Sequence, residues 1–145
     1  MKEFYNPIKI TTKGIRVLVT GSTGYIGGRL IPRLLSNNLK VRVLVRDKEK
    51  IKHKSWFSQV EIFEGDLTKI ESLHGLADGV DQAYYLIHSM SDSEDYIRLD
   101  RLVAENFVSL FKDIKQVIYL GGIAPEGDVV SDHLNSRLEV GRILR

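Results

Sequence analysis

Three glycines near the amino end of the chain, Gly21, Gly24 and Gly27, recur at intervals of three residues between an apolar run and a helical pattern. In this context the first permits a tight turn, the second lets the backbone approach a pyrophosphate, and the third lets helix pack against strand. The amide groups that begin the helix then face the phosphates. The pattern predicts a dinucleotide-binding loop composed of Gly21, Ser22, Thr23, Gly24, Tyr25, Ile26 and Gly27.

Arg46 follows the second apolar run, V-R-V-L-V, directly. A carboxylate at this place hydrogen-bonds the ribose hydroxyls of NAD, whereas a cation accommodates the 2′-phosphate of NADP. The planar guanidinium of Arg46 can bind a phosphate through two hydrogen bonds, and Lys48 and Lys50 add positive charge nearby. We therefore expect NADP(H) as cofactor, with NAD(H) less favoured. The alternative for Arg46 is a solvated side chain paired with Asp47.

The elements that would position these residues alternate between strand and helix patterns. Five short segments rich in Val, Ile, Leu and Tyr predict strands covered on both faces, at Ile15–Thr20, Val41–Arg46, Val60–Phe63, Ala83–Ile87 and Val117–Leu120. Helical spacing of apolar residues predicts helices at Gly24–Ser36, Thr68–Leu76, Glu94–Lys112 and Ser131–Leu144. This alternation predicts an α/β fold with a doubly wound parallel sheet, the Rossmann fold. Because a sixth strand normally follows, we expect residues 14–145 to be the front part of a longer protein, preceded by an extension over residues 1–13.

Several residues are assigned local roles. Thr68 and Glu71 have the spacing of a capping box, Ser93 can cap the helix that follows it, and Asn37–Asn38 can stop the first helix, which Pro32 should kink or weaken. The residues expected inside the fold are Tyr84, Tyr85 and Tyr119 in strands, Leu134, Leu138 and Ile143 on the last helix, and Asn106 as a buried amide bonded to the backbone.

The residues just past the five predicted strands are small or polar. They are Gly21, Arg46, Gly65–Asp66, His88–Ser89 and Gly121–Gly122. Open parallel sheets bind ligands outside the carboxyl ends of their strands, so a cofactor is expected there. His88 and Ser89 would lie beside the nicotinamide or its ribose, or they are ordinary polar residues after an apolar strand.

The glycine pattern G-x-x-G-x-x-G resembles that of the extended and atypical short-chain dehydrogenase/reductases, and other segments fit the same family. They include Gly65-Asp66-Leu67, Asp81, and the runs Tyr85-Leu86-Ile87-His88-Ser89-Met90 and Tyr119-Leu120-Gly121-Gly122, which resemble the NmrA-like branch. The resemblance covers roughly residues 14–145. It implies that Asp66 accepts a hydrogen bond from the adenine amino group, and that Leu67, Leu86 and Gly121 contact the cofactor. The alternative for Asp66 is a helix N-cap.

The resemblance also locates the catalytic positions. Members of this family use a Tyr and a Lys spaced Y-x-x-x-K together with a Ser, but here His133 and Arg137 stand at the first two positions and Gly121 or Gly122 near the third. A histidine can serve as a general acid near neutral pH, and an arginine supplies a fixed charge and ribose hydrogen bonds. The alternative for His133 is a solvent-exposed or helix-capping histidine.

Composition narrows the function classes. The 145 residues, 43% hydrophobic and 28% charged, suit one globular domain. The absence of cysteine excludes disulfides and thiolate metal sites and favours a cytoplasmic location, and no histidine–carboxylate cluster has metal spacing. The net charge of +2 and the lack of an apolar run of about 18 residues point to neither nucleic acid nor membrane as a partner.

Three functions remain open. The first is an NADP(H)-dependent oxidoreductase acting on a small carbonyl, enone or sugar-derived substrate. The second is a non-catalytic NADP(H)-sensing regulatory protein, which the departed Tyr-Lys motif favours. The third, a sugar-nucleotide epimerase, is weakened because that chemistry uses the same Tyr-Lys pair. The sequence does not identify the substrate, and the Glu94–Lys112 helix could form a homodimer interface or only cover the sheet.

Overall fold

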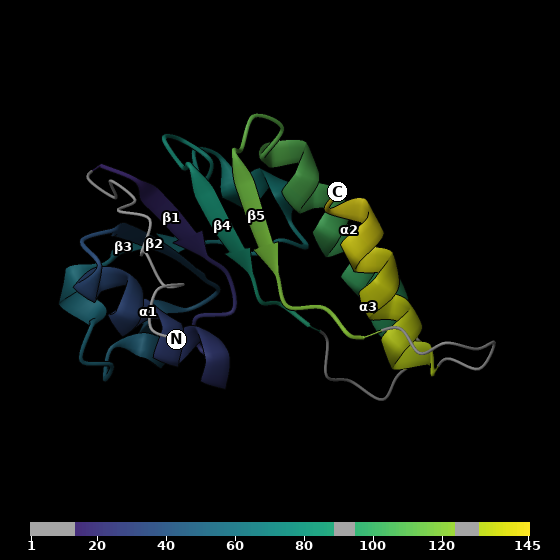
Figure 1. Ribbon diagram of the computed structural model, residues 1–145, viewed down its shortest axis with the longest axis horizontal. Helices are drawn as coiled ribbons and strands as arrows, with labels where there is room; N and C mark the ends of the chain where they lie inside the picture. The colour runs from purple at the N-terminus through teal and green to yellow at the C-terminus, as the bar shows by residue number, and fades with distance from the viewer. Residues whose placement is uncertain (1–13, 89–94, 124–130) are drawn as a thin grey trace, which may run out of the picture.

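The computed structural model describes residues 14–88, 95–123 and 131–145. Five parallel strands form one sheet: β1 (Arg16–Val19), β2 (Lys40–Val45), β3 (Glu61–Glu64), β4 (Gln82–Tyr85) and β5 (Gln116–Tyr119). The strand order is β3-β2-β1-β4-β5 (Figure 1). Because the order reverses at β1, the carboxyl ends of β1 and β4 border the crevice in which doubly wound sheets bind ligands.

Helices cover both faces of this sheet. Helix α1 (Tyr25–Ser36) lies on one face, and α2 (Asp95–Leu110) and α3 (Asp132–Ile143) lie side by side on the other (Figure 1). Short 3₁₀ helices occupy the connections: η1 (Lys48–Ile51), η2 (Phe57–Gln59) and η3 (Ile70–Leu73). The result is the three-layer α/β arrangement that the sequence predicts.

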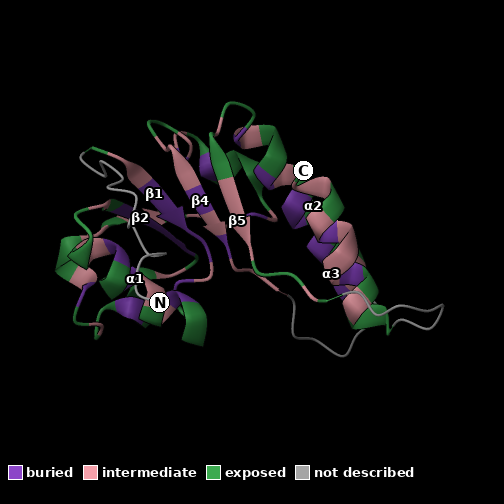
Figure 2. Ribbon diagram, in the orientation of Figure 1, coloured by how far each residue is buried: buried purple, intermediate pink, exposed green. Residues whose placement is uncertain are grey.

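Alternating strand residues build two separate cores. Val17 and Val19 of β1 point toward α1, whereas Leu18 between them points toward α2. The core on the α1 side also contains Ile31, Leu34, Val41, Val43, Val45, Ile51 and Trp56. The core on the α2 side also contains Leu44, Leu67, Leu73, Leu76, Ala83, Tyr85, Val103, Ala104, Phe107, Phe111 and Val140. Figure 2 shows β1 as a buried strand in the middle of the sheet, which explains its continuous apolar sequence.

The predicted strands are all present, each with ends displaced by one or two residues. The first, third and fourth predicted helices are also confirmed. Helix α1 runs through Pro32 without a break, and the missing N–H of that proline removes one bond of the helix. It stops where expected, since the Asn37 N–H donates to the Leu34 carbonyl and Asn38 takes a φ of 59°.

The prediction of a helix at Thr68–Leu76 is wrong. The segment forms turns and the short η3 helix instead, and no hydrogen bond joins Thr68 to Glu71 within the described residues. The glycines that follow explain this, because Gly75 and Gly79 take φ values of 82° and 66° and cannot continue a helix. The segment lies flat on the sheet and buries Leu67, Leu73 and Leu76.

The prediction of which residues of the last helix face inward is also wrong in detail. Leu134 and Leu138 are only partly buried, whereas Ser136 and Val140 are buried at 2% and 3% exposure. The reason is that α3 packs extensively against α2, which buries the short Ser136 between the helices. Ile143 does pack against the core on the α2 side.

The buried roles predicted for the aromatic strand residues and for Asn106 are confirmed. Tyr85 is 1% exposed and packs edge to face on Phe107, while Tyr84 and Tyr119 are partly buried against the two cores. The Asn106 amide donates to the Leu67 carbonyl at 2.7 Å. The predicted extension over residues 1–13 and the predicted cap at Ser93 lie outside the described residues.

Candidate functional site

The glycine loop between β1 and α1 has the close backbone contacts that its spacing requires. Gly21 takes a φ of 71°, and a Cβ there would lie 2.7 Å from the Leu86 carbonyl oxygen. A Cβ on Gly27 would collide with the Gly21 carbonyl oxygen. The Gly24 N–H donates to that same oxygen at 3.1 Å and closes the turn. Two of the three predicted glycine functions therefore correspond to specific contacts. Leu86 lies against the loop, and its predicted contact with the cofactor stays a prediction.

The amino end of α1 has polar groups available to an anion. Its N-cap is Gly24, which has no side chain to bind the first amides, and the first turn contains no acidic residue. Thr23, Gly24, Tyr25 and Ile26 are all exposed there. Amides without partners at a helix start, with the positive dipole end behind them, favour a phosphate.

Ser22 gives an independent test of whether this loop fits a phosphate-bearing cofactor. The side chain is 1% exposed, and its hydroxyl is buried with no hydrogen-bond partner among the described residues. A buried hydroxyl without a partner is unfavourable, and a ligand oxygen at the loop would satisfy it. The residues present therefore fit a dinucleotide, with Ser22 and the α1 amides as the groups that would hold its phosphates.

Thr20, directly before the loop, stabilises it through hydrogen bonds to the end of β4. This residue was not identified from the sequence. Its buried hydroxyl donates to the Tyr84 carbonyl and accepts from the Leu86 N–H, both at 3.1 Å. These bonds hold the end of β1 to the end of β4, where the crevice lies. The signal available in the sequence was a hydroxyl in the position directly before the first glycine of the loop.

At the end of β2, Arg46 is exposed and makes no ion pair within the described part of the chain. The pairing with Asp47 that was the alternative does not occur, because the Asp47 carboxylate caps η1 by accepting from the Glu49 N–H at 2.9 Å. Lys48 is paired with Glu64 at 3.2 Å, so it is not a free cation. The guanidinium of Arg46 is thus available to a ligand at this strand end.

Asp66 is held in a tight local turn. Its carboxylate accepts from both the N–H and the hydroxyl of Thr68, at 2.9 and 2.8 Å. Burial opposes ionisation, but the Thr68 hydrogen bonds and the charges of Arg46 and Lys69 prevail, and the pKa of Asp66 lies below its ordinary value. The capping alternative is thus partly realised, although no α-helix follows. Leu67 is buried in the core on the α2 side, and its predicted contact with the cofactor stays a prediction.

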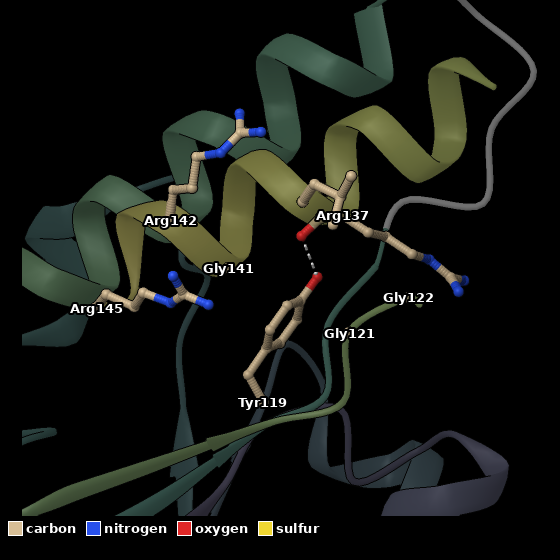
Figure 3. A pocket seen from close by; sticks show the side chains of 8 residues that line it. Tyr119, Gly121, Gly122, Arg137, Gly141, Arg142 and Arg145 are labelled. Carbon is tan, nitrogen blue, oxygen red and sulfur yellow. Dashed lines mark hydrogen bonds between the residues drawn. The ribbon is translucent and has the colours of Figure 1, made fainter. Parts of the chain in front are cut away.

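A second group of residues gathers at the ends of β4 and β5. His88 is partly buried, and its ring centroid lies 6.0 Å from that of Tyr119. The Tyr119 hydroxyl donates to the backbone carbonyl of Arg137 at 3.0 Å (Figure 3). The Arg137 side chain extends toward Gly121 and Gly122, and its Cδ lies 3.9 Å from where a Gly122 Cβ would be. The structure therefore brings together Arg137, His88 and Gly121, three of the predicted site residues.

A cavity of about 190 Å³ lies between the end of β5 and α3 (Figure 3). Its lining consists of Tyr119, Gly121, Gly122, Arg137, Leu138, Gly141, Arg142 and Arg145. Pockets for drug-sized ligands usually measure about 300–1,000 Å³, so this cavity alone is too small for a dinucleotide. In its lining, Arg137 lies beside the two glycines that follow β5.

His133 lies apart from this group. It is exposed in the first turn of α3, and its ring stacks on Tyr96 of α2 with centroids 4.6 Å apart. Its predicted role as a general acid stays a prediction. Ser89, also predicted to contact the cofactor, lies outside the described residues.

Asp100 and Ser136 form a buried polar pair that the sequence did not reveal. Asp100 of α2 is 7% exposed and accepts a hydrogen bond from the Ser136 hydroxyl of α3 at 3.0 Å. Its charge acts on the nearby titratable rings of Tyr85, His88 and Tyr119. An acidic residue on a helix usually faces solvent, and only the packing of α2 on α3 places this one beside the strand ends.

Asp81, one of the family landmarks, lies at the opposite end of the sheet. Its carboxylate accepts from the Arg16 N–H at 3.0 Å and pairs with Lys115 at 2.6 Å. Both contacts tie the amino ends of β1 and β5 to the start of β4, so Asp81 has a structural role.

Within the described residues, no group of histidines, cysteines and carboxylates could hold a metal ion. The helices of the same residues include none with the length and apolar character that crossing a membrane requires.

Comparison with known proteins agrees with this geometry. Residues 13–120 match the model of the NmrA-like family. Triphenylmethane reductase from Citrobacter sp. is 25% identical, with a TM-score of 0.74 over 90% of this chain and 45% of that one. The same reductase complexed with NADP(H) gives 24% identity and a TM-score of 0.72, again over 90% and 45%.

The UDP-Glc/GlcNAc 4-epimerase from Campylobacter jejuni is 18% identical, with a TM-score of 0.72 over 89% of this chain and 47% of that one. The chain therefore spans less than half the length of these solved structures. No curated protein matches it.

Proposed function

The chain belongs to the NmrA-like family and has its NAD(P)-binding fold, and we propose that it is an oxidoreductase that uses NADP(H) on a small carbonyl or sugar-derived substrate. The observation that carries the proposal is the amino end of α1. The helix start has no side-chain cap, and the buried hydroxyl of Ser22 in the same loop has no hydrogen-bond partner in the described part of the chain; both suit a pyrophosphate. When bound, the coenzyme would supply or accept a hydride.

The preference for NADP(H) rests on the end of β2. Arg46 is exposed and unpaired within the described residues, and Asp47 is already engaged as the cap of η1. A free guanidinium suits the 2′-phosphate, and the carboxylate that would suit the ribose hydroxyls of NAD already accepts the Glu49 N–H. The similar triphenylmethane reductase, solved with NADP(H), supports this choice.

Calorimetry tests the preference through Arg46→Asp. We expect this variant to lose at least about tenfold in NADPH affinity, or about 1.4 kcal/mol, while NADH affinity changes much less. Arg33→Asp makes the same charge change in the last turn of α1, far from the strand end, and should spare both affinities. Equal losses for the two coenzymes in Arg46→Asp would contradict the assignment.

In this proposal Arg137 supplies a fixed positive charge and hydrogen bonds to the nicotinamide ribose. It stands beside Gly121 and Gly122 at the end of β5, where the reactive end of the coenzyme is expected. Asp66, Leu67 and Leu86 border the adenine and ribose portions, and His133 remains a candidate acid. Residues 14–145 would together form the NAD(P)-binding domain.

One observation favours the second function, a non-catalytic NADP(H) sensor. The histidine at the position of the family's catalytic tyrosine stacks on Tyr96 and makes no described contact with the strand ends. Turnover distinguishes the two functions: NADPH oxidation in the presence of aldehydes, ketones and a triphenylmethane dye supports the reductase. Tight NADPH binding without turnover of any of them would favour the sensor. The epimerases share the fold, and no specific residue of this chain favours their chemistry.

The outer face of α2 suits a homodimer contact. Leu99 and Leu102 are 40% and 41% exposed on it, beside Arg98 and Arg101. We expect Leu99→Glu combined with Leu102→Glu to convert any dimer to monomer, as measured by analytical ultracentrifugation. A sedimentation coefficient unchanged from that of a dimeric parent would exclude this face.

A further inference from the structure

His88 occupies a position that its sequence context alone does not explain. It follows β4 at the carboxyl end of the sheet, where the crevice lies, yet its side chain is partly buried and tilted against the Tyr119 ring. Tyr119 in turn fixes α3 by donating to the Arg137 carbonyl. The imidazole is therefore held between the end of β4 and α3 by packing, as the side chain of a site residue needs to be.

Within the described residues, three titratable or charged groups act on this imidazole. The Tyr119 ring of β5 contacts it, and the charges of Asp100 on α2 and Arg137 on α3 reach it. Burial and, after it, the charge of Arg137 lower the pKa of His88, while Asp100 opposes them. The neutral imidazole is thus favoured near pH 7, and the two fixed charges adjust how readily it takes a proton.

Resting on the proposed function, we propose that His88 is the group that exchanges a proton with the substrate oxygen. In reduction, the carbonyl carbon would receive a hydride from NADPH, and the carbonyl π electron pair moves to the oxygen. The N–H of the His88 imidazolium gives its proton to that oxygen, and the neutral imidazole then regains a proton from solvent. In oxidation, the neutral imidazole takes the hydroxyl proton as the carbon gives its hydride to NADP⁺.

Arg137 and Asp100 have different parts in this step. The guanidinium of Arg137 stabilises the negative charge that develops on the oxygen and favours release of the His88 proton. Asp100, held by Ser136, is a positioning residue that acts through His88. His133 lacks this setting, because its ring is exposed and stacked on Tyr96.

Imidazole resonances followed by NMR test the proposal without requiring turnover. The chain has four histidines, so single His→Gln variants assign the signals of His53, His74, His88 and His133. We expect added NADP⁺ to shift the titration midpoint of His88 most. Without coenzyme, Arg137→Gln should move that midpoint to higher pH and Asp100→Asn to lower pH.

In the same experiment, the amide signals of Gly24–Gly27 distinguish a failure of the His88 inference from a failure of the proposed function. If NADP⁺ shifts those amides and leaves the His88 signal unchanged, the inference fails and the proposed function stands. If the response appears at His133 instead, the inference for His88 fails and His133 is the histidine beside the coenzyme. If neither the amides nor any imidazole responds, the proposed function fails.

Two electrophiles give a second readout, because only one of them needs a proton. When benzaldehyde takes a hydride, its oxygen becomes negatively charged and must be protonated, whereas a cationic triphenylmethane dye takes a hydride at its central carbon and becomes neutral. We expect His88→Gln to lose at least about a hundredfold more turnover on the aldehyde than on the dye. The exposed His74→Gln should lose equally little on both. Equal losses on the two electrophiles in His88→Gln would overturn the inference.

Discussion

The two halves of the candidate site are constructed from different parts of the chain. The half at β1 and α1 consists of backbone: a left-handed Gly21, the carbonyl that a Cβ on Gly27 would strike, and the uncapped amides of a helix. The half at β4, β5 and α3 consists of side chains, with His88, Arg137 and a buried acid contributed by separate elements. The first half is fixed by contiguous residues, and the second depends on how two helices pack.

The largest effect is expected from adding a methyl group to the backbone half. Gly27→Ala would place a Cβ against the Gly21 carbonyl, and we expect it to lower the free energy of unfolding by about 1–3 kcal/mol. NADPH affinity should fall at least about tenfold. Urea unfolding and calorimetry measure the two quantities.

Gly28→Ala is the matched control. A Cβ there would lie 3.8 Å from the nearest atom, the Ser22 carbonyl oxygen, which is an ordinary contact. Because alanine favours a helix, this variant should gain about 0.5–1 kcal/mol in stability and retain NADPH binding. If Gly27→Ala and Gly28→Ala had the same stability and the same NADPH affinity, the close packing of helix on loop would not be required for coenzyme binding.

In the side-chain half we expect a comparable effect on stability but a smaller effect on coenzyme affinity. Ser136→Ala removes a buried hydrogen bond to the Asp100 carboxylate, and we expect a loss of about 1.5–3 kcal/mol in unfolding free energy. NADPH affinity should fall less than in Gly27→Ala. Ser109→Ala, whose hydroxyl is exposed and bonds within its own helix, should change stability by less than about 0.5 kcal/mol. A Ser136→Ala variant as stable as the parent would show that the pair is not needed to join α2 and α3.

Tyr119→Phe should have a more modest effect. It removes the donor to the Arg137 carbonyl and should cost about 0.5–1.5 kcal/mol in urea unfolding. Tyr84→Phe is the control, since the Tyr84 hydroxyl makes no hydrogen bond within the described residues. If the two variants were equally stable, the Tyr119 hydroxyl would not contribute to holding α3 in place.

The smallest effect concerns pH. Because the folded state lowers the pKa of His88 below 6.5, the unfolded chain binds a proton there more readily. The corresponding stability is present above about pH 6.5 and is lost as the pH falls through the folded-state pKa. Unfolding free energies measured from pH 7.5 to 5 should therefore fall less steeply in His88→Gln than in the parent. His74→Gln, on an exposed loop, should keep the parental slope, and an identical slope in His88→Gln would contradict the burial of that imidazole.

The sequence was informative where function depends on contiguous backbone. Glycine spacing located the loop, and alternating apolar strands predicted the sheet, because both signals are local. The segment at Thr68–Leu76 was misassigned because burial of its leucines on the sheet overrode their helical spacing. The sequence of this region also contains Gly75 and Gly79, which take left-handed conformations that end the helical pattern.

The side-chain half could be predicted only in part. His88 and Gly121 followed from their places after strands, and Arg137 from the family resemblance. Asp100 and Ser136 lie thirty-six residues apart on separate helices, and nothing near either residue indicates the other. The same limit affected His133, whose position in a motif does not determine that its ring stacks on Tyr96.

Calorimetry of the unmodified chain with NADPH tests the central claim most directly. The start of α1 has no side-chain cap, and the Ser22 hydroxyl has no hydrogen-bond partner among the described residues. Together they predict a single saturable site with favourable heat and higher affinity for NADPH than for NADH. No measurable heat with either coenzyme at millimolar concentration, in a sample shown to be folded, would contradict it.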